Sequence, residues 1–242
     1  MKKTIAPLLA FMLCLSLCAC GSRKVEGKGY RSPEEALMAY AEALKAGDVN
    51  KALSTFAVET YVENYSLEDQ IEFARAYQLS FPLENEDDFT RQVNLITRQN
   101  GIISGLKYLY LYFALGEEKM QKSIITLSDG GYADAEDLVD DLVVEDWMKA
   151  LSQMKIRDYV YLEDVQDGDA IERTEEHLEK LCRVYGCDEI VPLAVEVKLD
   201  GRNYYLTMNV ANYNGKWFNL NQGGILSSIM GGNAYSGGLI PQ

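Results

Sequence analysis

The feature that most limits the fold of this sequence is a hairpin pattern near its C-terminus. From Val191 to Leu199, apolar residues alternate with polar or small ones, which is typical of a strand with one covered face. Asp200-Gly201 then forms a two-residue hairpin turn. The turn predicts a register that places the apolar residues of both strands on one side of a sheet. The facing pairs are Leu199 with Arg202, Val197 with Tyr204, Val195 with Leu206, and Leu193 with Met208.

A second turn, at Asn214-Gly215, allows two registers. A two-residue turn directs Phe218 and Leu220 outward, whereas a three-residue loop that begins at Tyr213 directs them toward the covered face. We predict the three-residue loop with a glycine bulge, because it keeps one face apolar. The two registers differ in these pairs: Val210 faces Asn219 in the first, and in the second Val210 faces Phe218 and Met208 faces Leu220.

A pair of helices is predicted from Ser32 onward. Ser32 is a hydroxyl N-cap, Pro33 occupies the first helical position, and Glu35 is placed to bond back to the cap. Gly47 is a left-handed stop, and Asp48 caps the next helix. The first helix buries one stripe, formed by Leu37, Tyr40, Ala41 and Leu44.

The segment SPEEALMAYAEALKAGDVNKALSTF, residues 32–56, resembles the opening helix pair of nuclear transport factor two-like domains, in particular those of bacterial lipoproteins of unknown function. The helix and strand patterns predict an α+β fold in which helices cover a curved antiparallel sheet, and the resemblance implies a cone with a small pocket at its open end. The candidates for the pocket lining are Tyr40, Tyr204, Met208 and Phe218, and the alternative is that they are plain core. The chain departs from the family pattern at about residues 60–132, which we interpret as a helical insertion in a domain spanning 32–220.

Acidic residues crowd the segment from Asp134 to Asp146, which we predict to be one helix running to about Met154. Its face is expected to be solvated, and the alternative is a face that meets a cation or a basic partner. The expected buried stripe is Val139, Leu142, Val143, Trp147, Leu151 and Met154. A strand at 156–165 and a helix that Gly186 ends are predicted to follow.

The N-terminus carries an export signal. Lys2 and Lys3 precede an apolar run, Ile5 to Leu17, that is shorter than the ~20 residues of a membrane-spanning helix. Leu17-Cys18-Ala19-Cys20 resembles a bacterial lipobox, which implies that residues 1–19 are a lipoprotein signal peptide and that the sulfur of Cys20 carries diacylglycerol. An ordinary signal peptide is the alternative. We therefore expect the protein on the extracytoplasmic face of the cell membrane.

Residues 20–31 are polar and rich in glycine, and we predict a flexible tether. Arg23, Lys24, Lys28 and Arg31 outnumber Glu26, so the tether is either a basic segment near anionic lipid or a solvated linker. The eleven Cα–Cα steps from Cys20 to Arg31 span at most ~40 Å. Residues 221–242 are rich in glycine as well, and we expect a mobile tail in which Ile225, Leu226 and Ile229 are able to dock.

The mature chain is strongly acidic. The full sequence has a formal charge of −14, and removal of Lys2 and Lys3 leaves 21 basic against 37 acidic residues, which gives −16. This charge repels nucleic acid, so we expect no nucleic-acid partner. It also repels an anionic membrane, so the domain is expected to stand off the bilayer unless a local basic patch holds it.

Beyond the signal and the anchor cysteine, two cysteines remain, Cys182 and Cys187, and both a disulfide and two buried thiols are compatible with their spacing. His177 is the single histidine, and it lies among glutamates. We predict no metal, no cofactor and no catalytic set. Tyr205 and Trp217 are expected to share the second sheet face as a binding surface.

These observations favour a membrane-anchored binding module for an envelope protein or a cell-wall component. The alternatives are a small-ligand sensor and an isomerase-like or dehydratase-like enzyme that uses the cone. The enzyme requires a carboxylate or a histidine inside an apolar pocket.

Overall fold

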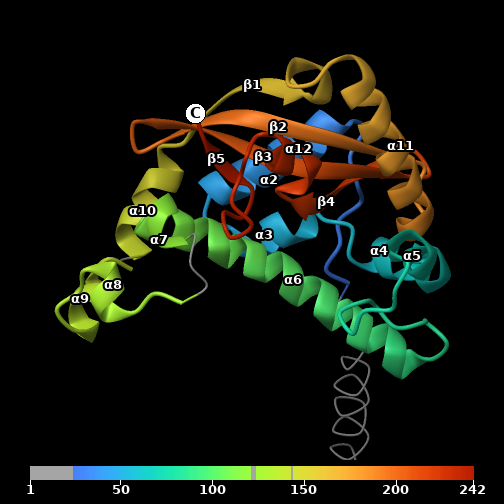
Figure 1. Ribbon diagram of the computed structural model, residues 1–242, viewed down its shortest axis with the longest axis horizontal. Coiled ribbons are helices and arrows are strands. Elements are labelled where there is room, and N and C mark those ends of the chain that lie inside the picture. Colours follow the sequence, from blue (N-terminus) through green and yellow to red (C-terminus); the bar gives the residue numbers. More distant parts are fainter. Residues whose placement is uncertain (1–23, 121–123, 143) are drawn as a thin grey trace, which may run out of the picture.

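A curved antiparallel sheet forms the centre of the molecule (Figure 1). The structure is a computed structural model, and it describes residues 24–120, 124–142 and 144–242. The strand order is β1-β2-β3-β4, and β5 pairs with β3 beyond the end of β4. The α+β class predicted from the sequence is therefore confirmed. The strands are β1 (Lys155–Tyr161), β2 (Glu189–Leu199), β3 (Arg202–Tyr213), β4 (Lys216–Gln222) and β5 (Leu239–Pro241).

Helices cover both faces of this sheet. Helix α2 lies across β2, β3 and β4 on one face, together with α3, α6 and α10, whereas α11 and α12 contact the opposite face. None of the described helices is long and apolar enough to cross a membrane. The helices are α2 (Pro33–Lys45), α3 (Val49–Ser54), α4 (Glu59–Asn64), α5 (Leu67–Ala74), α6 (Asp88–Leu115), α7 (Glu117–Met120), α8 (Leu127–Gly130), α9 (Ala135–Asp140), α10 (Val144–Ser152), the 3-10 helix η2 (Leu162–Asp164), α11 (Gly168–Tyr185) and α12 (Gly224–Ile229).

The predicted ends of the first helix pair are confirmed. Ser32 Oγ accepts the N–H of Glu35 at 3.3 Å at the start of α2, and Asp48 Oδ1 accepts the N–H of Lys51 at 2.8 Å at the start of α3. Gly47 adopts φ +66°, as a left-handed helix stop requires. The predicted stripe of α2 is buried against the sheet: Leu37, Tyr40, Ala41 and Leu44.

The β2–β3 register is the one that the sequence predicted. Val197 faces Tyr204, Val195 faces Leu206, and Leu193 faces Met208 across the Asp200-Gly201 turn. These side chains are buried in the core under α2.

The prediction for the second turn is wrong. Tyr213 faces Lys216, so the turn consists of the two residues Asn214 and Gly215, and Val210 faces Asn219. Phe218 therefore points away from α2, yet it is buried, because α11 covers that face at this end of the sheet. The sequence argument assumed one covered face, and here both faces are covered.

Asn219 takes the core position that the prediction gave to Phe218. Its side-chain amide donates to the carbonyl of Ala36 at 2.8 Å and to Thr55 Oγ1 at 2.9 Å. Its backbone N–H donates to the carbonyl of Thr55 at 3.0 Å. The amide nitrogen of this buried side chain satisfies polar groups of α2 and of the loop after α3, whereas its Oδ1 has no hydrogen-bond partner among the described residues.

The part of residues 60–132 that the structure describes contains helices as its regular elements, as expected. The aromatic run from Tyr108 to Phe113 lies within the long helix α6. Its N-terminus has a capping box in which Asp87 Oδ1 accepts the N–H of Thr90 at 2.8 Å.

The acidic segment is two helices, not one. Helix α9 ends at Asp140 and α10 begins at Val144, and Val139 is 63% exposed instead of buried. Trp147, Leu151 and Met154 are buried as predicted. Val143 lies outside the described residues.

Neither terminal segment behaves as a flexible extension. From Val25 onward the predicted tether is packed on the domain, and Glu26 is only 6% exposed. The expected mobile tail forms α12 and β5, and in it Leu226, Leu239 and Ile240 are buried. Residues of both segments are buried against the sheet and its helices or form hydrogen bonds with them.

Candidate functional site

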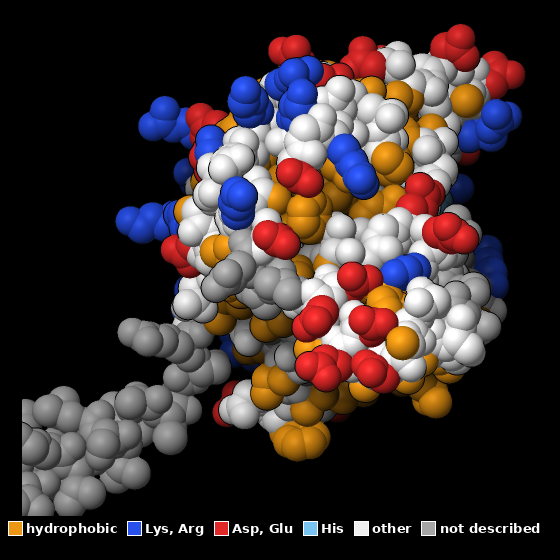
Figure 2. Space-filling view, turned by 90° about the vertical axis from the view of Figure 1, so that its left-hand side faces the viewer, with side chains coloured by type: hydrophobic (Ala, Val, Ile, Leu, Met, Phe, Trp, Pro, Cys, Tyr) orange, Lys and Arg blue, Asp and Glu red, His pale blue; other side chains and the backbone are white. Residues whose placement is uncertain are grey.

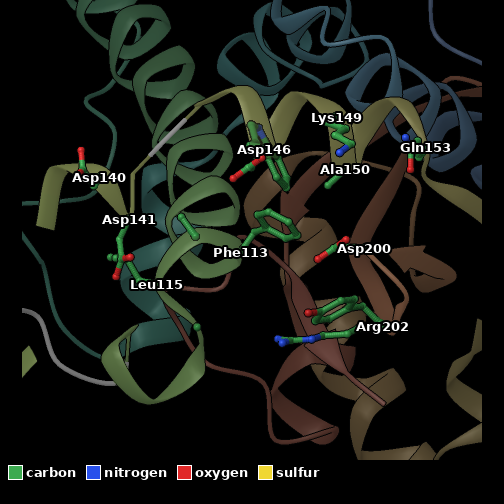
Figure 3. Close-up of a pocket in the computed structure, with 14 residues that line it drawn as sticks. Phe113, Leu115, Asp140, Asp141, Asp146, Lys149, Ala150, Gln153, Asp200 and Arg202 are labelled. Atoms are coloured by element: carbon green, nitrogen blue, oxygen red, sulfur yellow. The ribbon is translucent and has the colours of Figure 1, made fainter. Parts of the chain in front are cut away.

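A groove of about 590 Å³ lies at the β2–β3 turn end of the sheet. We call its least exposed lining the floor: Phe113 at the end of α6, Trp147 and Ala150 on α10, and Tyr204 on β3. Phe113 and Ala150 are labelled in Figure 3. Figure 2 shows this end of the molecule, where acidic side chains gather beside an apolar hollow. We take this groove as the candidate site.

Packing between α6 and α10 holds the aromatic floor in place. The Phe113 and Trp147 rings lie 5.1 Å apart between centroids, and Tyr110 lies 6.1 Å from Trp147. The Tyr110 hydroxyl donates to the carbonyl of Leu142 at 2.5 Å, which ties α6 to the segment between α9 and α10. Tyr204 reaches the floor because the β2–β3 register turns it toward α2 and α6.

Charged side chains form the rim of the groove. Asp146, Asp200 and Arg202 stand around Phe113 in the view of Figure 3, whereas Asp140 and Asp141 lie to one side. All of them are exposed, as are Lys149 and Gln153. The lining therefore holds four carboxylates against two cations, Lys149 and Arg202.

One rim carboxylate is already engaged. Asp141 Oδ2 accepts the Tyr132 hydroxyl at 2.7 Å and lies 3.2 Å from Lys119 Nζ. The Tyr132 hydrogen bond, followed by Lys119, lowers the pKa of Asp141. Lys119 also donates to the Tyr132 hydroxyl, and its ammonium lies 4.1 Å from the centroid of that ring. This network joins the ends of α7 and α9 and leaves Asp140, Asp146 and Asp200 as carboxylates without an ion-pair partner among the described residues.

Only one of the predicted pocket residues reaches the groove. Tyr204 lines it, but Tyr40 and Met208 are fully buried in the core. Tyr40 packs edge-on against Phe56 at 5.3 Å, and burial raises the pKa of its hydroxyl. Phe218 lies on the other face of the sheet, beside Tyr213. Around Tyr40, Met208 and Phe218 the side chains are core, as the alternative reading held.

Tyr205 and Trp217 do not form a common surface. The two-residue turn at Asn214-Gly215 places them on opposite faces of the sheet, because one residue of register reverses every side chain. Tyr205 packs beside Leu226 of α12, and Trp217 packs against the core under α2. Both are partly buried.

The two described cysteines are free, half-buried thiols at the end of α11. The N–H of Cys187 donates to the carbonyl of Cys182 at 3.1 Å, which brings the residues together around Gly186. A hydrogen bond between the two side chains lowers the pKa of Cys182 and raises that of Cys187. Cys20, the predicted lipid attachment site, lies outside the described residues.

No described carboxylate meets the condition set for the enzyme alternative. Glu26 is the buried acid of the described chain, and its oxygens accept the N–H groups of Val58 and Thr60 and the hydroxyl of Thr60. His177 is exposed and lies against the ring of Phe73 at 5.3 Å. In the same part of the chain, no group of three or more histidine, cysteine, aspartate or glutamate side chains is placed to hold a metal ion.

Sequence reasoning missed most of the groove. It interpreted Asp200 only as a turn residue, it placed Trp147 on a buried stripe, and it gave Phe113 no role in a site. The acidic composition of residues 134–146 was the one available signal, and it indicated a cation or a basic partner as the alternative to a solvated face. Nothing in the local sequence shows that α10, α6 and the β2–β3 turn meet.

Comparisons with known proteins do not identify a family or a ligand for this chain. No family model matches the sequence, and no curated protein matches it. A solved structure that is similar to this chain is a cystatin-like protein from Ruminococcus gnavus ATCC 29149, with 17% sequence identity and a TM-score of 0.44. The alignment covers 77% of this chain and 39% of that one, so this chain spans about two fifths of the length of that protein.

Proposed function

We propose that this protein is a lipid-anchored binding protein of the extracytoplasmic membrane face, and that its groove takes a ligand bearing amino or guanidinium groups. The observation that carries the ligand class is the rim of carboxylates that have no ion-pair partner among the described residues: Asp146 and Asp200 stand beside the aromatic floor, and Asp140 lies to one side of it. Envelope proteins and amino-bearing wall polymers are partners that carry such groups.

The physical basis is the complementarity of charge and rings. A cationic group gains hydrogen bonds from ionised carboxylates and is also attracted to the faces of aromatic rings, at ~0.5–2 kcal/mol for each ring contact. Lys149 and Arg202 add donors for the carbonyl groups of the same ligand. The volume of about 590 Å³ lies within the ~300–1,000 Å³ typical of sites for small ligands.

The position of the groove supports a partner beyond the membrane. Tyr204 marks the groove on β3, and Asn212, at the other end of that strand, faces Trp217, which pairs with Tyr30 of the N-terminal segment. Eight residues of strand separate these points by about 27 Å. The described N-terminal segment, which Lys24 begins, therefore lies at the end of the sheet opposite the groove.

The ligand class is tested with tetralysine and with its fully Nε-acetylated form as the neutral probe. A Trp217→Phe background leaves Trp147, on the groove floor, as the single tryptophan. We expect tetralysine to change its fluorescence saturably at low salt and the acetylated peptide to leave it unchanged. The variant D146N/D200N should weaken the binding at least about tenfold, since two charge pairs are lost.

Asp158→Asn, an exposed aspartate of β1 outside the groove, is the matched control and should bind as the parent does. Equal affinity of D146N/D200N and the parent would refute the assignment of the groove. The anchor is tested separately by mass spectrometry of the N-terminus of protein purified from its native membrane. We expect a diacylglyceryl group on Cys20, and an unmodified start at another residue would refute the anchor.

A further inference from the structure

The first described residues are fixed to the domain by hydrogen bonds. The N–H groups of Val25 and Glu26 donate to the two carboxylate oxygens of Glu59, at 2.7 and 3.0 Å. The N–H of Gly27 donates to the carbonyl of Ser54 at 2.8 Å, and Tyr30 exchanges two backbone hydrogen bonds with Trp217. The backbone is therefore held in place from Val25 onward.

This attachment shortens the reach of the predicted anchor. Five Cα–Cα steps separate Cys20 from Val25, so the two residues are at most about 18 Å apart, against ~40 Å for a tether that stays free to residue 31. If Cys20 carries lipid, as the proposed function holds, the surface beside Val25 lies next to the bilayer. The domain then has a preferred orientation on the membrane.

The surface at this point is basic. Three exposed lysines, Lys24, Lys28 and Lys216, line a shallow hollow of about 490 Å³ together with Tyr213 and the Asn214-Gly215 turn region. We call these three residues the lysine face. None of the three has an ion-pair partner in the described part of the chain.

The acidic groups beside the lysine face are engaged in backbone hydrogen bonds. Glu26 is buried beneath the hollow and accepts the N–H groups of Val58 and Thr60. Glu59 accepts from the N-terminal segment, and Asp188 Oδ2 accepts the N–H of Asn214 at 2.7 Å. These contacts orient the carboxylates toward the protein backbone, so the ammonium groups are the charges that extend into solvent.

We propose that the lysine face binds anionic lipid headgroups of the membrane that carries the anchor. Each lysine near an anionic bilayer gains ~1 kcal/mol, and the attraction acts over roughly one Debye length, ~8 Å at physiological salt. The mature chain carries a net charge of −16, so an anionic bilayer repels it as a whole, and the lysine face is a basic surface that lies next to the proposed anchor. The groove at the opposite end of β3 is then turned away from the bilayer.

The test uses the lipidated protein in vesicles of phosphatidylcholine, with and without phosphatidylglycerol. A water-soluble amine reagent labels exposed lysines, and mass spectrometry gives the rate for each. We expect Lys24, Lys28 and Lys216 to label about fivefold more slowly on the anionic vesicles, the factor that corresponds to ~1 kcal/mol. High salt should restore the rate.

Lys155 and Lys198 are the internal controls, because they face each other at the opposite end of the sheet. They should label at one rate on both kinds of vesicle. In the unlipidated Cys20→Ser chain, K28E/K216E should lower flotation with anionic vesicles at least about tenfold, whereas K155E/K198E should not.

The outcomes separate this inference from the proposed function. Suppose that the Cys20 lipid is confirmed and each of the five lysines labels at the same rate on anionic vesicles as on neutral ones. That result would refute the lysine face and leave the anchor intact. Protection that depends on protein concentration and not on phosphatidylglycerol would assign the face to a second copy of the chain, which also refutes it. An unmodified Cys20 with flotation that still depends on Lys28 and Lys216 would refute the anchor alone.

Discussion

Single residues that are polar and buried hold the N-terminal segment of this protein. Glu26 accepts the N–H of Val58 at 2.8 Å, the N–H of Thr60 at 2.9 Å and the hydroxyl of Thr60 at 2.6 Å. These donors lie at the start of α4, which begins at Glu59. The Glu26 carboxylate therefore caps that helix from 33 positions earlier in the chain. Composition alone classed Glu26 as a tether residue.

Replacement of Glu26 should therefore destabilise the protein. We expect Glu26→Ala to lower the free energy of unfolding by about 3 kcal/mol, because three donors lose an ionised acceptor. Urea unfolding followed by circular dichroism measures the change. Glu42→Ala, on the exposed side of α2, is the control and should stay within about 0.5 kcal/mol of the parent. A Glu26→Ala midpoint equal to that of the control would contradict the capping role.

A second polar residue, Arg98 on α6, joins three parts of the chain. Its guanidinium donates to the carbonyl of Ala57 at 3.1 Å, to Asn221 Oδ1 at 3.2 Å and to the carbonyl of Leu220, and it lies 4.2 Å from the centre of the Tyr61 ring. Burial lowers the pKa of Arg98 and raises the pKa of Tyr61 to about 12. The folded state therefore favours the neutral phenol of Tyr61.

The raised pKa of Tyr61 predicts a loss of stability at alkaline pH. Its contribution is fully present below the unfolded pKa of about 10 and is lost as the pH rises through about 12, because the unfolded chain releases the proton first. We expect Tyr61→Phe to unfold as the parent does at pH 7 and to lose less stability between pH 10 and 12. Urea unfolding across this range tests it, and parallel curves for the two proteins would contradict it.

At the scale of elements, two short turns set the sheet. Asp200-Gly201 and Asn214-Gly215 both have positive φ at both positions, which is the conformation of the tight two-residue hairpin. At the second turn, this local preference prevailed over the apolar alternation that favoured a longer loop. This register leaves no large apolar side chain of β4 in solvent, because α11 covers the face to which Phe218 and Leu220 turn. Turn chemistry and coverage of both faces together decided the register of β4.

Gly215 should be sensitive to a side chain for backbone reasons alone. It has φ +76°, and no atom lies within 4 Å of the Cβ that alanine would add. We expect Gly215→Ala to cost about 1 kcal/mol in thermal or urea unfolding.

Gly101→Ala is the matched control for this change. Gly101 lies within helix α6, and its added Cβ would likewise meet no atom within 4 Å. The same chemical change should therefore stabilise the protein by about 0.5–1 kcal/mol at that position. Effects of the same sign at both positions would contradict this account.

At the scale of the whole molecule, the chain ends complete the sheet. Tyr30 pairs with β4 at one end, and β5 pairs with β3 beyond the other end of β4, where Tyr205 faces Ile240 and Leu206 faces Leu239. The glycines of the last segment permit this close approach: a Cβ at Gly238 would lie 2.7 Å from the carbonyl oxygen of Thr207. A glycine-rich composition here serves packing and not mobility.

Removal of residues 238–242 should therefore unfold part of the sheet. Leu239 and Ile240 are at most 5% exposed, and loss of two such side chains costs about 3–5 kcal/mol. The urea midpoint of the shortened chain measures this. Removal of Gln242 alone deletes one backbone hydrogen bond, to Asn203, and should cost under about 1 kcal/mol. If both shortened chains match the parent, β5 does not belong to the folded unit.

The sequence by itself determined the features that depend on neighbouring residues. The caps at Ser32 and Asp48, the stops at Gly47 and Gly186, and the β2–β3 register follow from backbone chemistry and from alternation within about ten positions. These local rules were enough to predict an α+β chain with an antiparallel sheet.

Only the tertiary structure decided which faces are covered and which side chains meet. Arg98 lies 122 positions from Leu220, and Glu26 lies 32 positions from Val58, so no local pattern joins them. The groove brings together α6, α10 and the β2–β3 turn in the same way, and the second register depended on α11. An alternating pattern predicts which residues of a strand share a face, but the helix that covers that face comes from elsewhere in the chain.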